Sequence, residues 1–101
     1  MGPGAAQDES EDVLAFIAAR RVPVLNSAVV DIAEAAPDDL PAVVHRVRGI
    51  LGSYGLFAAQ EHVDRLSDAL NDDDADAEAR VRARRTTVDA LRALADGEVD
   101  Q

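Results

Sequence analysis

Apolar residues recur every three or four positions along most of the chain, and this spacing predicts amphipathic helices. We expect an N-terminal helix over 8–22, then a helix over 23–36, a helix from residue 40 to a turn at 52–55, and helices over 56–70 and 75–95. Alanine, valine and leucine supply most of the apolar positions, and only 3% of the residues are aromatic. Small aliphatic side chains of this kind favour closely packed helices over a sandwich of strands.

Prolines, aspartates and glycines mark the predicted helix boundaries. Pro23 fits the first turn of a helix, so the preceding helix is predicted to stop before it. Asp39 and Asp74 are predicted to cap the helices that follow them, and Gly97 offers a stop for the last helix. Residues 1–7 are predicted to form a flexible tail and 98–101 a short C-terminal tail, so that one domain covers 8–97.

The predicted fold is all-α: an up-and-down four-helix bundle with an additional N-terminal helix. A chain of 101 residues is large enough for one core and too small for two. The N-terminal helix has an apolar face of Val13, Leu14, Phe16 and Ile17. The positions predicted to face the core in the other helices are Leu25, Ala28, Val29, Ile32, Ala36; Leu40, Val44, Val47, Leu51, Tyr54; Leu56, Ala59, Val63, Leu66, Leu70; and Ala77, Val81, Val88, Leu91, Ala95.

The charge balance is strongly acidic, with a formal net charge of −10 from 20 acidic and 10 basic residues. Such a chain should be repelled by nucleic acid and by anionic membranes. The arginines between Arg80 and Arg85 have acids three or four residues away, which favours pairs within one helix over a nucleic-acid surface. No apolar run is long enough to span a membrane and the first residues do not resemble a secretory signal, so we expect a cytoplasmic protein.

One histidine lies on the polar side of its predicted helix. His45 falls roughly 150° from the centre of the apolar stripe, with Arg48 and Gly49 one turn further along and Gly52 two turns along. Each glycine inside a helix costs roughly 1 kcal/mol relative to alanine, so the missing side chains need a reason. They either clear space for another protein around the ring, or let a neighbouring helix approach, or fray the helix end.

The spacing His45-x-Val47-Arg48-Gly49, with a second glycine at Gly55, resembles the signature of histidine-containing phosphotransfer (HPt) domains of bacterial phosphorelays. That family has a histidine, an apolar residue, a lysine or arginine and a glycine, and a second glycine that closes the helix. The resemblance extends over about 23–95. Two positions depart from the common pattern, because Ile50 replaces a small polar residue and Arg48 replaces the usual lysine; we expect Ile50 to pack against the core.

The resemblance implies a function and a partner. His45 would accept a phosphoryl group from a receiver-domain aspartate of a response regulator or hybrid histidine kinase, and pass it to another. Arg48 would stabilise the phosphoryl oxygens, while Gly49 and Gly52 would leave room for the partner. The apolar docking surface would comprise Val43, Leu56 and Phe57. The chain needs no cofactor of its own, since Mg²⁺ would come with the receiver domain, and we expect a monomer.

Other chemistry has little support in the sequence. There are no cysteines, and the Asp72–Asp74 run lacks the ligand spacing of a calcium loop. His62 is predicted to be a partly buried packing residue, and a two-histidine metal site is not expected. Without a nucleotide-binding loop the chain is not predicted to be an enzyme in the ordinary sense. The alternative function is a degenerate HPt-like module that binds a receiver or kinase domain without accepting phosphate.

Overall fold

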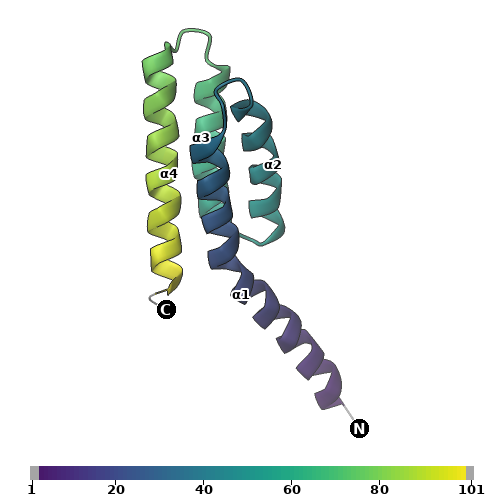
Figure 1. Cartoon of the computed structure of the whole chain (residues 1–101). Coiled ribbons are helices and arrows are strands. Elements are labelled where there is room, and N and C mark those ends of the chain that lie inside the picture. Colours follow the sequence, from purple (N-terminus) through teal and green to yellow (C-terminus); the bar gives the residue numbers. More distant parts are fainter. Residues whose placement is uncertain (1–2, 100–101) are drawn as a thin grey trace.

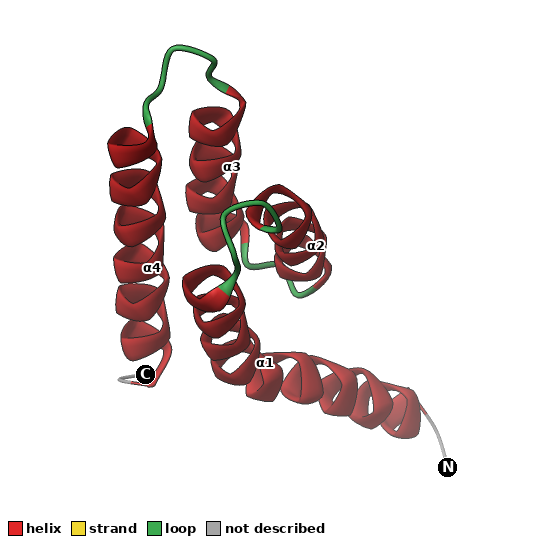
Figure 2. Ribbon diagram, turned by 45° about the horizontal axis from the view of Figure 1, so that its top comes forward, coloured by secondary structure: helices red, strands yellow, loops and turns green. Residues whose placement is uncertain are grey.

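The computed structural model describes residues 3–99, with side chains for residue 13 and for 15–98. Within this part of the chain all regular structure is helical: α1 spans Pro3–Glu34, α2 Leu40–Ser53, α3 Phe57–Asn71 and α4 Ala77–Val99 (Figures 1 and 2). Successive helices run in opposite directions, and α1 packs against both α2 and α4 (Figure 1). The predicted all-α class is therefore confirmed.

The core lies along the axis shared by the four helices. Its fully enclosed side chains come from every helix and include Leu25 and Ile32 of α1, Leu51 of α2, Leu66 of α3 and Leu91 of α4. Each such side chain contributes roughly 1.5–3 kcal/mol when removed from water. The positions predicted for α2 and α3 are confirmed, with Tyr54 and Leu70 packed partly buried at the core edge. Of the positions predicted to face the core over 23–36, only Ala36 is exposed, and it lies just after the end of α1.

The predicted helix break before Pro23 is wrong, because α1 continues through this residue as one helix of 32 residues. A proline inside a helix removes one backbone hydrogen bond and bends the axis without always ending the helix. Figure 2 shows α1 changing direction along its length. The additional N-terminal helix is thus not a separate element, and α1 begins at Pro3 within the predicted tail, of which residues 1 and 2 lie outside the described residues.

The last helix also differs from its prediction. The cap is Asp76, whose Oδ1 accepts a hydrogen bond of 2.7 Å from the backbone N–H of Ala79. Asp74 instead donates its own N–H to Asp72 Oδ1 at 3.0 Å, so it shapes the loop and caps nothing. The helix then runs through Gly97 to Val99 because one glycine in a helix weakens it without ending it. The predicted C-terminal tail is therefore helical through Val99, and residues 100 and 101 lie outside the described residues.

Within α4 the buried positions are Thr87, Val88, Leu91 and Ala95, while Val81 is 56% exposed and Ala77 is also exposed. The first turns therefore do not follow the predicted inward face. Arg84, in the same part of α4, reaches the end of α1, where its Nη1 donates to the carbonyl oxygen of Ala35 at 2.8 Å. This contact satisfies a carbonyl just after the end of α1, which helps to fix α4 against α1.

Candidate functional site

The candidate site is on α2, whose predicted cap Asp39 makes no side-chain hydrogen bond to the first turn. Pro41 stands in the first turn, where its missing N–H leaves no helix hydrogen bond unmade. After Ser53 the chain turns at Gly55, whose φ of 69° is the left-handed conformation that glycine adopts most easily. The N–H of Leu56 donates to the carbonyl oxygen of Leu51 at 2.9 Å and closes the turn. Gly55 therefore ends the helix, as the sequence predicted.

His45 is exposed, on the side of α2 away from the buried residues Val44 and Val47. Within the described part of the chain, its ring takes part in no hydrogen bond or ion pair. The exposed ring can accordingly be reached by a group that approaches from outside the bundle. This is the environment that the sequence predicted for the side chain.

The two arginines beside the histidine are held by acids on the flanking helices. Arg48 Nε forms an ion pair with Asp64 Oδ1 of α3. Arg46 Nη2 lies 3.4 Å from Asp31 Oδ2 of α1. The arginine side chains are 59% and 50% exposed and the aspartates 39% and 42%, so each pair contributes at most about 1 kcal/mol to folding. Their main effect is to place two guanidinium groups on either side of the exposed face of α2.

The two glycines near His45 have different surroundings. A Cβ added to Gly52 would lie 2.7 Å from Nε2 of Gln60, which also donates to the carbonyl oxygen of Arg48 at 3.3 Å. Gly52 therefore makes room for a side chain of α3, which is the neighbouring-helix explanation. A Cβ added to Gly49 would have no atom within 4 Å. The described part of the chain gives no packing reason for Gly49.

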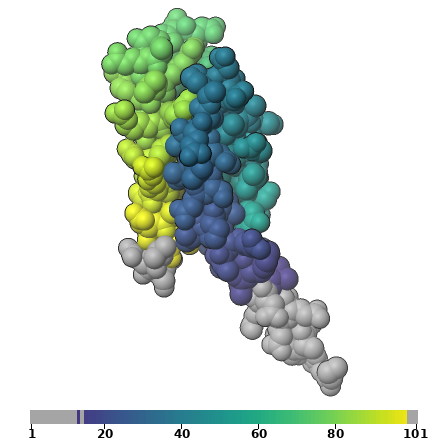
Figure 3. Space-filling view, in the orientation of Figure 1, coloured from purple at the N-terminus to yellow at the C-terminus, as the bar shows by residue number. Residues whose placement is uncertain are grey.

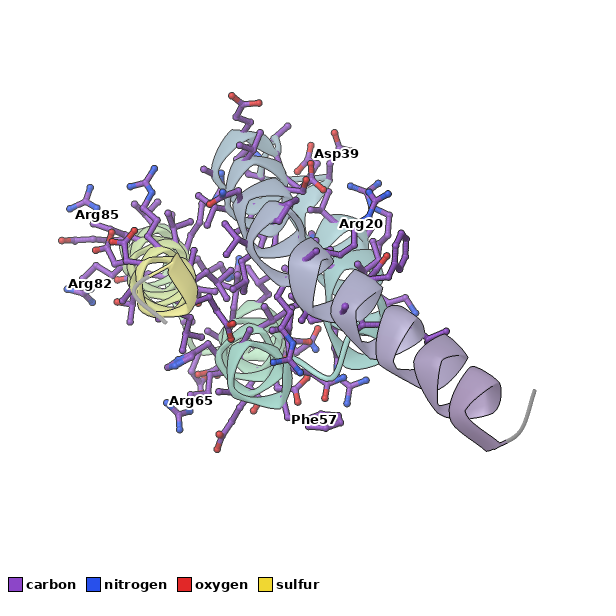
Figure 4. All side chains as sticks on the ribbon, turned by 90° about the horizontal axis from the view of Figure 1, so that it is seen from below. Arg20, Asp39, Phe57, Arg65, Arg82 and Arg85 are labelled. Atoms are coloured by element: carbon purple, nitrogen blue, oxygen red, sulfur yellow. The ribbon has the colours of Figure 1, made fainter. Side chains whose placement is uncertain are left out.

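The proposed docking residues are not brought together. Leu56 is only 8% exposed and belongs to the core, so its side chain cannot form part of a docking surface, and that prediction is wrong. Val43 is half-buried against the core. Phe57 is 68% exposed and projects outward at the start of α3 (Figure 4). From His45 to the end of α2 is roughly 12 Å at 1.5 Å per residue, so Phe57 lies well away from the histidine.

Ile50 does not pack fully, contrary to the prediction. It is 41% exposed and lines a groove between α1 and α2 together with Pro23, Val24 and Tyr54. The groove holds about 270 Å³. The isoleucine therefore adds an apolar side chain to the surface beside the exposed face of α2.

Other candidate chemistry can be placed on the same structure. His62 is partly exposed on α3, between the buried Ala59 and Leu66 in helical register. No cluster of three or more metal-ligating side chains occurs among the described residues. The outer arginines of α4, Arg82 and Arg85, point away from the bundle (Figure 4), and Arg82 pairs with Glu78 at 4.0 Å. None of the described helices has the length and apolar character needed to cross a bilayer.

Asp64 and Gln60 contact the arginine and a glycine near His45, and neither residue was predicted from the sequence to do so. The signal was available in the helical hairpin, because a short turn makes α2 and α3 antiparallel neighbours. In an antiparallel pair of helices, the residue numbers of facing positions add up to the same value. This rule pairs Gly52 with Gln60 and Arg48 with Asp64.

Comparison of the chain with protein-family models, with curated sequences and with solved structures finds no match.

Proposed function

We propose that this protein is a histidine phosphotransfer protein of a cytoplasmic phosphorelay, with an HPt-like up-and-down bundle. It would accept a phosphoryl group on His45 from a receiver-domain aspartate and pass it to another. The observation that carries the proposal is the exposed imidazole of His45, with open space at Gly49 one turn further along the same helix. A partner's active site can close over such a ring without meeting a bulky side chain.

The transfer requires one bond to form and one to break. The lone pair of the unprotonated ring nitrogen of His45 attacks phosphorus, and the bond from phosphorus to the aspartyl oxygen breaks. The aspartate leaves as a carboxylate, while the proton on the other ring nitrogen stays in place. The reverse sequence delivers the phosphoryl group to the next receiver. Mg²⁺ on the receiver would neutralise charge on the phosphoryl oxygens.

Arg48 is placed to support the phosphorylated state. Its contact with Asp64 uses Nε, and the terminal nitrogens of a guanidinium carry four further N–H donors. These donors can meet phosphoryl oxygens on His45, one helical turn away, through charge-assisted hydrogen bonds. Asp64 then has two opposed effects, because it orients the guanidinium and also adds a negative charge near the phosphoryl group.

The expected partner is a receiver domain, alone or within a hybrid histidine kinase. It would cover the exposed face of α2, including Gly49, and reach Val43. Phe57 could extend the contact only if the partner also spans the turn between α2 and α3. The space beside Gly52 is filled by the side chain of Gln60, so Gly52 leaves no room for the partner.

The experiment that tests this proposal uses the full chain and a receiver domain phosphorylated on its aspartate. After incubation the chain should carry one phosphoryl group that is lost in acid and kept in alkali, as phosphohistidine is. Mass spectrometry under alkaline conditions should place the group on the peptide that contains His45. Absence of any adduct with receivers from the same genome, or an adduct at another residue, would contradict the proposal.

Asp64 gives a further prediction, because asparagine keeps an oxygen that can accept from Arg48 Nε but removes the charge. We expect Asp64→Asn to lengthen the lifetime of phosphorylated His45, by up to about fivefold for a surface charge effect of up to about 1 kcal/mol. Asp64→Ala should show a smaller gain, since it also releases the arginine. The decay of the alkali-stable label, followed at one pH and salt concentration, measures both. A shorter lifetime in Asp64→Asn would contradict the charge argument.

A second candidate function is favoured by the same ion pair. If Asp64 keeps Arg48 from the histidine, the chain would be an HPt-like module that binds a receiver or kinase domain without accepting phosphate. Binding to a receiver that survives His45→Gln, with no transfer in the wild type, would identify this function.

A further inference from the structure

The N-terminal half of α1 forms an arm that projects beyond the bundle. α1 has 32 residues, whereas α2 and α3 have 14 and 15. At about 1.5 Å per residue, α1 is roughly 25 Å longer than α2 and α3, and roughly 13 Å longer than α4, which has 23 residues. The molecule is accordingly elongated, with principal extents of 62 × 24 × 18 Å. Figures 1 and 2 show the arm leaning away from the other helices, while the C-terminal half of α1 lies against them (Figure 3).

The described part of the arm exposes large apolar side chains. Val13 is 58% exposed and Phe16 is 56% exposed. Arg20, which lies over the Phe16 ring, also lines the groove of Pro23 and Ile50, so the groove begins where the arm meets the bundle. Large exposed apolar side chains on a helix segment that leans away from the bundle are a common mark of an interaction site.

The charges along the arm indicate which partner would fit. Four acidic residues occur within 8–12, and the two basic residues Arg20 and Arg21 follow the apolar segment. Asp12, Phe16 and Arg20 succeed one another at four-residue steps, which places these positions on one side of the helix. Along the helix an acidic position is followed by an aromatic one and then by a basic one. A second copy that runs antiparallel presents the same positions in the reverse order, so each acidic position faces a basic one.

We propose that this face of α1 is a self-association surface, on which a second copy of the chain packs its α1 antiparallel about a two-fold axis near Phe16. Position 12 of each copy then faces position 20 of the other, and the two Phe16 rings meet at the axis. The guanidinium of Arg20 already lies 4.9 Å from the centre of the Phe16 ring of its own chain. A parallel arrangement would place acids against acids in a chain of net charge −10.

The proposed dimer is an alternative to the monomer that was expected from the sequence. It stands independently of phosphotransfer at His45, because α1 contributes no group to that chemistry. It follows that the two proposals can fail separately.

Sedimentation equilibrium of the full chain, from about 10 μM to about 1 mM, tests the proposal. The wild type should reach a dimer, and the charge reversals Arg20→Asp and Asp12→Arg should each raise the dimer Kd at least about tenfold. The double variant with both reversals should return the Kd to within about threefold of the wild type, because the complementary pair is restored with its signs exchanged.

Phe16→Ser tests the apolar part of the surface and should also raise the Kd at least about tenfold. Phe57→Ser is its matched control, since this exposed phenylalanine lies on α3 and should leave the Kd unchanged. Circular dichroism should show the same helix content in every variant, which separates loss of pairing from loss of folding. A wild type that stays monomeric throughout, or a double variant no tighter than the single reversals, would overturn the proposal.

Discussion

His45→Gln should take up no phosphoryl group from a phosphorylated receiver domain, whereas His62→Gln should be labelled like the wild type. Glutamine keeps a polar side chain of similar reach but has no nucleophilic nitrogen, so transfer is lost completely. Because His45 is exposed and His62 is partly exposed, neither change removes an enclosed side chain from the core. We therefore expect stability changes within about 0.5 kcal/mol for His45→Gln and little more for His62→Gln.

The two histidine variants also provide the control for this experiment. Both remove one imidazole from the chain, and these are its only two histidines. Label retained by His45→Gln and lost by His62→Gln would assign the acceptor to α3 instead of α2. Labelling of both variants at the wild-type level would show that His45 is not the sole acceptor, and thermal melts would show whether either variant had lost its fold.

The apolar periodicity predicted the core well where one helix face has to be buried along its whole length. In α2 and α3 the buried residues Leu51 and Leu66 fall on the predicted stripes. These helices are short and packed from end to end, so tertiary structure and local pattern specify the same face. The exposure of His45 followed directly, since it is a consequence of the same periodicity.

Prediction was poorer where a long-range contact or an unpaired helix decided the outcome. Pro23 was predicted to mark the boundary between two helices, but a single helix can accommodate a proline by bending. At the start of α4 the apolar side chain of Val81 is exposed, and Arg84 reaches the end of α1 instead. The periodicity of one helix carries no information about a carbonyl group 49 residues away.

The motif glycines show the same limit at single residues. The sequence alone did not distinguish a packing role from a functional role for either Gly49 or Gly52. The structure separates them, because only Gly52 has a neighbouring side chain within 4 Å of an added Cβ. That distinction depends on Gln60, which lies on another helix and contributes nothing to the local pattern.

Gly49→Leu should stabilise the folded protein by about 0.5–1 kcal/mol, because leucine is a much better helix former and the site is open. The same variant should receive the phosphoryl group from a receiver domain at least about tenfold more slowly, because a side chain one turn from His45 would obstruct docking. A tenfold slower transfer corresponds to an increase of about 1.4 kcal/mol in the activation barrier.

Two comparisons isolate the docking effect. Phosphoramidate, a small phosphodonor that needs no protein surface, should label His45 equally fast in the wild type and in Gly49→Leu. Gly97→Leu is the matched control, because Gly97 also lies inside a helix with open space around an added Cβ, but on α4. It should show no slowing of transfer from the receiver. Transfer to Gly49→Leu at the wild-type rate would mean that a partner does not approach His45 over Gly49, and the missing side chain would then have no explanation in the relay.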